Sequence, residues 1–588
     1  MFNIKQYALL LIAVFLLASC KKDFLEVEAR DRVGDDAVWA STNNADLFLN
    51  DIYNQLPDLN NETEHLEQYT DNSDVGVTWM AGYASIRVAN ITPSNLPRGP
   101  WDMWYWGKES NNDSRTGNYE KIRKCNLFIT KVGASALPDD YKKERIAEAR
   151  FLRAMYYHWL WMAYGGVPVI TNVLDNLTQG DDIYVARSTS KQTFEFLDKE
   201  LGEIADILPE KQSEPGRATK GAALTLKGWC ELFYASPLRN SGDVANPGGD
   251  LERWKLAAKT NKQVMQLGVY DLYPDFRNLF LRVGNNSPES IFARQYMEGK
   301  GGQLEGKEGP TIVNGVQQGW GNFQPTQELV DEFSMANGKA IYEPGSGYNP
   351  QQPYIGREKR FYQTILFNGS PWQGDTLRMV VGLGRKTANE IDLGYTSDVT
   401  HTGYYACKRL DEKILGSDNR ANSTSYQNYM FFRFAEVLLS FAEAENEVNG
   451  PTAEVLAAVN RVRTRAGNLP TVEATYGTVN KQQMRDIIRR ERRVELAFED
   501  RRWWDVLRWK IADRMMDGST GVLNRPEKGM VITGTTTLTY TPVNVSNRLF
   551  LPKMYTMPIP QHVLDRNPKI RAQSGGEDNW QNGQNPGY

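Results

Sequence analysis

The chain has few of the residues that build metal centres and disulfide frameworks. It has four cysteines and four histidines, and the histidines lie far apart at 65, 158, 401 and 562. Metal sites need ligands at short, regular spacings, so we expect no metal site and no cofactor. Cys125, Cys230 and Cys407 are widely spaced, unlike the cysteines of a disulfide framework. Each is expected to be a small buried residue.

Charge excess and long apolar runs are also missing. The formal net charge is -4, so no basic excess favours nucleic acid or an anionic membrane surface. After Cys20 the longest apolar stretch, residues 156–170, is broken by Gly165, Gly166 and Pro168, and no run is long enough to cross a bilayer. With 40% hydrophobic and 24% charged residues the composition is globular. Aromatic residues are plentiful at 11%, and fifteen residues are tryptophan.

The first twenty residues have the pattern of an export signal. A basic start is followed by a short apolar core over residues 8–17 and by Leu17-Ala18-Ser19-Cys20. The final cysteine resembles the lipobox of bacterial lipoprotein signals, although an ordinary signal with a coincidental cysteine is the alternative. The resemblance implies a signal peptide over residues 1–19 and lipidation of Cys20. Several acyl chains anchor a protein firmly, so we expect a lipid-anchored protein outside the cytoplasm.

Amphipathic helices dominate both ends of the chain. Apolar residues at spacings of three and four predict helices over 118–133, 140–164, 190–207, 217–236 and 252–267, and later over 429–449, 452–466, 480–499 and 501–511. Loops rich in glycine and proline separate them. Helix–turn–helix units of this kind stack as a tetratricopeptide-like solenoid, although no strict 34-residue consensus is present.

The middle of the chain, from about 283 to 430, is rich in glycine, asparagine, proline and single aromatic residues. It contains one convincing helix, 326–336, and strand-like pieces at 290–296 and 360–369; a further strand-like insert covers 529–543. Long irregular segments in compact domains usually carry function. We therefore expect one compact, mainly α body with a helical-repeat region over 20–280 and a C-terminal region, with the ligand-side loops, over 281–588.

Several long motifs resemble the RagB/SusD family of Bacteroidetes nutrient-uptake lipoproteins. Residues 433–444 (RFAEVLLSFAEA), 460–467 (NRVRTRAG) and the segment from Glu491 to Trp509 match its C-terminal signatures. Residues 558–568 and 584–588 match its usual ending, and residues 147–170 and 235–240 fit its N-terminal half. Asp500 stands where glycine is commoner. The resemblance therefore covers the whole predicted mature chain.

The resemblance implies a SusD-like fold and a binding function. Such proteins are outer-membrane lipoproteins that form a lid over a SusC-like TonB-dependent transporter, capture oligosaccharides, or peptides in some branches, and deliver them to the barrel. The solenoid would face the transporter and the irregular loops would face the ligand. Lys21, Lys22 and Asp23 partly resemble a surface-export tether, which favours the cell exterior.

Candidate ligand-binding residues follow from the chemistry of sugars, which need flat aromatic faces and planar polar groups. Binding positions differ across the family, so none is carried over from it. Three tryptophans lie between 101 and 106, so at least one is expected to face solvent or ligand. Any single aromatic could instead close a small core. The loops 71–106 and 314–324 combine aromatic and polar groups most densely and supply Asp71, Asp74, Trp79, Trp101, Trp104, Trp320 and Phe323, with Trp372 and Tyr404 as weaker additions.

The charged signature around Glu491, Glu495 and Glu499 looks catalytic, but its helical spacing favours a structural ion-pair network. No nucleophile motif of the Gly-x-Ser-x-Gly type is present. We therefore expect no enzyme activity. Alternatives are a helical-repeat surface scaffold without a small ligand, a peptide-binding lid, and a secreted glycosidase, which would need two carboxylates about 5–9.5 Å apart. The sequence does not identify the glycan, nor decide whether calcium is bound.

Overall fold

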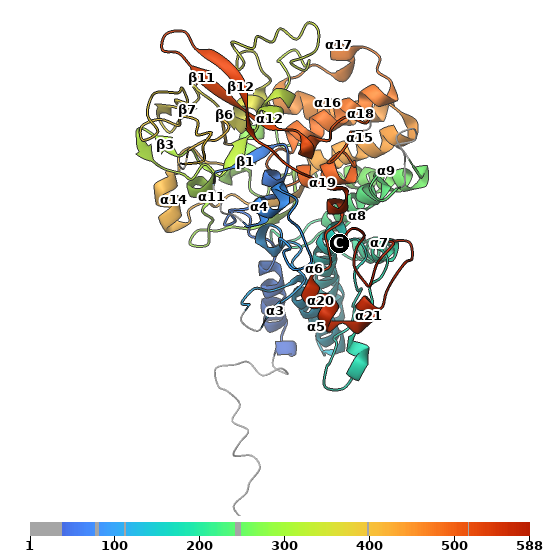
Figure 1. The fold of residues 1–588 in the computed structure, drawn as a ribbon. Coiled ribbons are helices and arrows are strands. Elements are labelled where there is room, and N and C mark those ends of the chain that lie inside the picture. The colour runs from blue at the N-terminus through green and yellow to red at the C-terminus, as the bar shows by residue number, and fades with distance from the viewer. Residues whose placement is uncertain (1–37, 77–80, 111–112, 241–248, 397–398, 516) are drawn as a thin grey trace, which may run out of the picture.

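The computed structural model describes residues 38–76, 81–110, 113–240, 249–396, 399–515 and 517–588 (Figure 1). The N-terminal half is helical, as predicted, and from α5 to α9 each helix packs against the next along the chain. Its helices are α3 (Thr42–Asn54), α4 (Ala81–Arg87), α5 (Asn118–Ala134), α6 (Asp139–Tyr164), α7 (Ser190–Ala205), α8 (Lys220–Ala235) and α9 (Leu251–Gln266).

Helix α6 is the central element of this half. It has two acidic residues, Asp139 and Asp140, in its first turn, where their negative charges interact favourably with the positive end of the helix dipole. It ends at Gly165, whose φ of 72° is accessible to glycine without steric strain. From Phe151 to Tyr164 every residue is buried. A helix that is buried all round is the core of its layer, and α5 and α7 pack on it.

The second half continues the helical layer, because α15 packs against α9. Residues 429–433, predicted as the start of a helix, instead form strand β10 (Tyr429–Arg433), which pairs with β2 (Ser290–Arg294). The aromatic run Tyr-Met-Phe-Phe suits a strand better than a helix start. The helices are α15 (Phe434–Asn449), α16 (Ala453–Gly467), α17 (Val472–Tyr476), α18 (Lys481–Glu495) and α19 (Arg502–Arg508).

The middle region is loop-rich, with short helices and small two-stranded antiparallel sheets. The predicted helix at 326–336 is shorter, as α12 (Gln327–Glu332). Residues 360–369 were predicted as a strand, but most of them form helix α13 (Lys359–Thr364) and strand β6 (Ile365–Leu366). The other elements are α10 (Phe276–Leu279), α11 (Leu304–Glu308), α14 (Gly416–Asn422), β1 (Ser73–Val75), β3 (Ile312–Val313), β4 (Val316–Gln317), β5 (Phe323–Pro325), β7 (Pro371–Trp372), β8 (Asp375–Thr376) and β9 (Tyr405–Ala406).

The predicted strand-like insert is a hairpin of β11 (Glu527–Thr533) and β12 (Thr539–Ser546), which projects from the loop-rich side (Figure 1). The loop-rich side packs against the second half of the helical layer, because α12 contacts α18 and α13 contacts α16. This arrangement agrees with the SusD-like fold prediction. The mainly α, tetratricopeptide-like architecture is confirmed.

A buried ion-pair network joins the helical layer to the loops. The Arg433 guanidinium donates to Glu289 at 2.7 Å, to Glu495 at 2.7 Å and to Glu499 at 2.6 Å, and all four side chains are buried. Glu495 also accepts from Arg360 at 2.9 Å. The network is structural, as the helical spacing indicated. Its arginines Arg360 and Arg433 lie outside the neighbouring segment 492–502, however.

The last residues return to the first half of the chain. After α20 (Gln561–Arg566) and α21 (Pro568–Arg571), Asn585 donates from its side-chain amide to the Tyr164 carbonyl at 2.9 Å. Arg187 donates to the side-chain oxygen of Asn585 at 2.8 Å and to the Gly583 carbonyl at 2.7 Å. The C-terminal coil is therefore an integral part of the N-terminal layer.

Two composition-based expectations concern cysteines and membrane spans. Cys125, Cys230 and Cys407 are free and buried, which confirms their predicted role as small core residues. Over the described ranges, none of the helices combines the length and the apolar character needed to cross a membrane.

Candidate functional site

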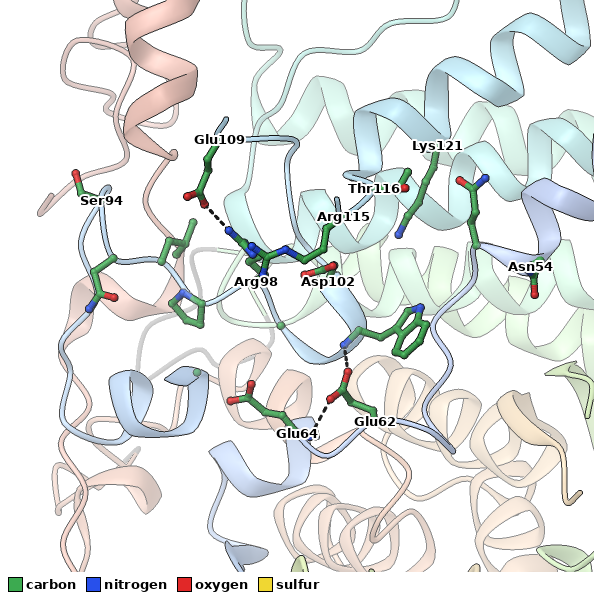
Figure 2. A pocket seen from close by; sticks show the side chains of 17 residues that line it. Asn54, Glu62, Glu64, Ser94, Arg98, Asp102, Glu109, Arg115, Thr116 and Lys121 are labelled. Atoms are coloured by element: carbon green, nitrogen blue, oxygen red, sulfur yellow. Dashed lines mark hydrogen bonds and ion pairs between the residues drawn. The ribbon is translucent and has the colours of Figure 1, made fainter. Parts of the chain in front are cut away.

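A hollow with an exposed tryptophan at its edge lies between α3, α5 and the loop residues 94–102. It has a volume of about 790 Å³ and is called here the Trp101 pocket (Figure 2). Most of its lining residues have polar or charged side chains, which supply hydrogen-bond partners for a hydroxylated ligand. The lining residues are Asn54, Gln55, Glu62, Glu64, Gly82, Ser94, Asn95, Leu96, Pro97, Arg98, Gly99, Trp101, Asp102, Glu109, Arg115, Thr116 and Lys121.

Trp101 is held in an unusual backbone conformation at the edge of this pocket. It lies in the short 3₁₀ helix η3 (Pro100–Asp102), with φ 48° and ψ 42° in the left-handed region. Its backbone N–H donates to the Glu62 carboxylate at 2.9 Å, and its side chain is 38% exposed. Left-handed backbone is costly for a residue with a Cβ and concentrates at functional sites. The expectation that one tryptophan of the 101–106 run faces outward is confirmed at Trp101.

The strain at position 101 gives a testable stability difference. Glycine reaches positive φ without steric cost, so a Trp101→Gly variant should be more stable than Trp101→Ala by about 1 kcal/mol. Urea unfolding followed by circular dichroism measures this difference. Equal stability of the two variants would contradict the left-handed conformation at this position.

Most charged groups of the lining are already engaged. Arg98 pairs with Glu109 at 2.9 Å, and the Arg115 guanidinium pairs with Asp113 at 2.9 Å. The Glu62 carboxylate accepts from three backbone N–H groups, those of Thr63, Glu64 and Trp101. The Glu64 carboxylate accepts from the Tyr83 N–H, and burial raises its pKa. These contacts hold the loops that form the wall.

Lys121 and Asp102 differ from these groups. Lys121 extends into the pocket from the first turn of α5, and Asp102 points inward from the opposite loop (Figure 2). Lys121 is only 4% exposed, and burial lowers its pKa to about 8. Burial also raises the pKa of Asp102, although Lys121 opposes that rise. Within the described part of the chain, neither side chain forms a hydrogen bond or an ion pair.

Four of the predicted aromatic residues are buried and do not line the Trp101 pocket. Trp104 is fully buried, donates from its indole N–H to the Pro97 carbonyl at 2.7 Å, and packs edge-on against Trp504. Phe323 contacts His65 and Phe498 in a second core. Trp372 and Tyr404 are buried in the cores of the loop-rich side. Their rings are covered by protein, so their assignment to an open ligand face is corrected: they are core residues.

The two predicted acidic residues are buried as well. Asp71 accepts two hydrogen bonds of 2.8 Å, from Nε and Nη2 of Arg502. Arg493 and Arg502 hold its pKa well below its usual range against the cost of burial. Asp74 accepts from the hydroxyl groups of Tyr83 and Tyr395. Both carboxylates are engaged by protein partners, which fix the 71–76 segment in place.

Trp320 is partly exposed and lies outside the lining of the Trp101 pocket. Its loop nevertheless docks on the same segment as Trp101, because the Asn322 side chain donates to the Thr63 carbonyl. Trp101 and the Trp320 loop are thus both attached to residues 62–63. Cys20 and Trp79 lie outside the described residues, so their predicted roles stay predictions.

The sequence interpretation missed Lys121, Glu62 and Glu64, and it included Asp102 only as part of the 71–106 loop. A signal for Lys121 was present: it lies with Asn118, Ile122 and Cys125 on the buried stripe of α5. Lysine is rarely fully buried without a partner, so a lysine on the apolar stripe of an amphipathic helix deserved a functional interpretation.

The fold and the pocket together define a helical-repeat scaffold that carries a loop-built, polar pocket with an aromatic edge. Family models match both halves of the chain: one described as "SusD family" over residues 288–588 and one described as "Starch-binding associating with outer membrane" over residues 23–227. The chain belongs to the SusD family.

Individual relatives and solved structures agree with this assignment. The SusD-like protein P2 of Formosa agariphila is 26% identical over 424 residues, which are 69% of this chain and 73% of the relative. The SusD-like protein P38 of the same organism is 24% identical over 536 residues, 88% of this chain and 94% of the relative. A SusD-like carbohydrate-binding protein from Bacteroides fragilis superposes with a TM-score of 0.73 at 27% identity, covering 91% of this chain and 99% of the other.

Proposed function

We propose that the protein is a lipid-anchored outer-membrane protein that binds oligosaccharides at the cell surface and passes them to a SusC-like TonB-dependent transporter. The single observation that carries the glycan part is the Trp101 pocket, where an exposed indole borders a hollow lined mainly by polar groups. Aromatic faces pack on the C–H faces of sugar rings, and polar groups bind their hydroxyls.

The family description and the relatives support the rest of the proposal. A family model is described as starch-binding and outer-membrane-associated, and a solved relative is named a carbohydrate-binding protein. The predicted lipidation of Cys20 would tether the protein, and the helical layer would face the transporter while the Trp101 pocket faces the captured glycan. A peptide ligand, or a scaffold with no small ligand, remains the competing hypothesis.

We also propose that the protein binds without cleaving. A glycosidase needs two free carboxylates across the sugar. In the described lining, Glu62 and Glu64 are occupied by backbone N–H groups and Glu109 by Arg98, which leaves Asp102 as the carboxylate without such a contact. One open carboxylate does not make the pair that the reaction requires.

The first test is affinity electrophoresis of protein lacking residues 1–20 against plant, fungal, bacterial and host polysaccharides. We expect retardation by one class without release of reducing ends. Retardation by none of them would favour the peptide or scaffold hypothesis, and released sugar would favour a glycosidase.

Trp101→Ala should weaken binding of the retained glycan by about 1–3 kcal/mol, on the scale of losses when a stacking aromatic is removed from a nucleobase. Tyr342→Ala is the matched control, because Tyr342 is an aromatic residue of 68% exposure outside this pocket. Titration calorimetry measures both affinities. Equal affinity in wild type and Trp101→Ala would show that the glycan binds elsewhere.

A further inference from the structure

Lys121 is placed where a lysine lowers stability unless it meets a ligand. The residue is only 4% exposed, and its ammonium group lies 5.4 Å from the centre of the Tyr156 ring, a cation–π contact that supplies no hydrogen-bond acceptor. A largely buried charge without a hydrogen-bond partner is costly. The first turn of α5 adds to the cost, because the positive end of the helix dipole disfavours a cation. Such violations of local rules cluster at functional sites.

Asp102 presents the complementary group. It follows Trp101 in the same left-handed turn, with φ 53°, so the backbone that exposes the indole also directs this carboxylate into the pocket (Figure 2). Asp102 and Lys121 approach the same hollow from a loop and a helix without forming an ion pair with each other. The Lys121 ammonium is therefore available as a hydrogen-bond donor, and the Asp102 carboxylate as an acceptor, for a ligand in the pocket.

We infer that Lys121 and Asp102 hold neighbouring hydroxyl groups of an uncharged sugar, and that the pocket selects neutral glycans over acidic ones. The inference rests on the proposed function and names the substrate class of the same site. The ammonium donates to a hydroxyl oxygen, and a hydroxyl hydrogen is donated to the carboxylate, so two adjacent hydroxyls satisfy both groups. Hydrogen bonds that involve a charged partner are the strong ones.

An acidic sugar fits the same pocket less well. Its carboxylate or sulfate would gain from Lys121, but it would also lie in a pocket lined by Asp102, Glu62 and Glu64. Arg98 and Arg115 are already paired with Glu109 and Asp113 and do not add free positive charge. Like charges in a partly buried site repel strongly. The two groups without an ion-pair partner, the Lys121 cation and the Asp102 anion, have a net charge of zero, which suits a neutral ligand.

The pair also predicts the pH dependence of binding. Lys121 has a pKa of about 8, so its amine is a charged ammonium at a lower pH and loses a proton and its charge at a higher pH. Affinity for the sugar therefore falls as the pH rises through that value. Asp102 has a raised pKa, so it loses its charge on acidification earlier than an ordinary aspartate does, and affinity falls there as well. The charged groups near the pair are Glu62, Glu64, Arg98, Glu109, Asp113, Arg115 and Glu120.

The experiment uses Lys121→Met and Asp102→Asn, with Lys124→Met as the matched control. Lys124 lies on the same helix but is exposed and paired with Asp51 at 2.7 Å. Each pocket variant should bind the retained polysaccharide about tenfold or more weakly, and the control should bind like wild type. The double variant should lose less than the product of the two single losses, because both groups hold one ligand. Thermal unfolding by circular dichroism checks that each variant folds.

A second measurement separates the ligand classes. Titration calorimetry of the wild-type protein compares neutral gluco- and manno-oligosaccharides with oligogalacturonate of equal length. Binding of a neutral oligosaccharide, with loss in both pocket variants, is the expected result. Tighter binding of oligogalacturonate would overturn the inference and leave glycan binding intact. The inference would also be overturned, with glycan binding intact, if both pocket variants kept wild-type affinity while Trp101→Ala lost affinity. Absence of retention by every polysaccharide overturns the inference and the proposed function together.

Discussion

Replacing Arg433 by methionine is expected to lower the free energy of unfolding by about 3–5 kcal/mol. Arg433 uses its guanidinium on Glu289, Glu495 and Glu499, and all of these groups are buried. Methionine fills much of the same volume but supplies no donor. Carboxylates would then stay buried with fewer partners, which costs more than the ion pairs themselves contribute. The loss is expected to affect the whole fold, because the network joins β10, α18 and the loop before β2.

A surface ion pair provides the control. Lys262 contacts Glu454 at 2.7 Å, but both side chains are substantially exposed. Lys262→Met should change the free energy of unfolding by about 1 kcal/mol or less. Urea unfolding of wild type and both variants, followed by tryptophan fluorescence, makes the comparison. A similar small loss in Arg433→Met would mean that the network is dispensable for stability.

Trp104→Ala should lower the free energy of unfolding by about 3–5 kcal/mol, the usual range for truncating a buried tryptophan. Its ring is fully buried against Trp504 and its indole N–H donates to the Pro97 carbonyl. The cavity left by alanine cannot be refilled by its neighbours, and the carbonyl loses its donor. Trp104 is therefore expected to be a stability residue, although it lies three positions from Trp101.

Trp101→Ala is the natural partner of this variant, because the two residues share a loop and a side-chain type. Trp101 is 38% exposed, so its truncation should change stability little and affect binding instead. Thermal unfolding and calorimetric titration of both variants separate the two roles. Strong destabilisation by Trp101→Ala, or an unchanged melting temperature for Trp104→Ala, would contradict the burial of these rings.

The helices could be predicted from the sequence because their apolar residues recur at helical spacing over many turns. Helix α6 is an example, with its acidic first turn and its glycine end. The strand prediction for 360–369 was right at 365–366 but wrong at 360–364, which are helical, because the segment is short and its conformation depends on distant partners. Arg360, in α13, is buried through ion pairs with Glu358, Glu491 and Glu495. Such tertiary pairing leaves no local periodic signal.

The candidate site could be predicted only in part. The crowding of tryptophans between 101 and 106 correctly indicated an outward-facing ring, but composition could not decide which one. That choice depends on the left-handed turn at Trp101 and Asp102. The pocket also needs Glu62, 39 residues before Trp101, and Lys121 on the helix that follows the loop, and these residues become neighbours only after folding. Loop aromatics such as Trp372 and Tyr404 proved to be core residues because the irregular region has its own small cores.

The contact between Arg187 and Asn585 spans 398 residues, and this separation sets a delay during synthesis. At the usual rate of about 5–20 residues per second, Arg187 leaves the ribosome roughly 20–80 s before its partner. Until then the Tyr164 carbonyl lacks the Asn585 donor, and the Arg187 guanidinium lacks its acceptors on Gly583 and Asn585. The first half of a nascent chain therefore lacks these contacts until translation is nearly finished, and a chain that ends before Asn585 would never form them.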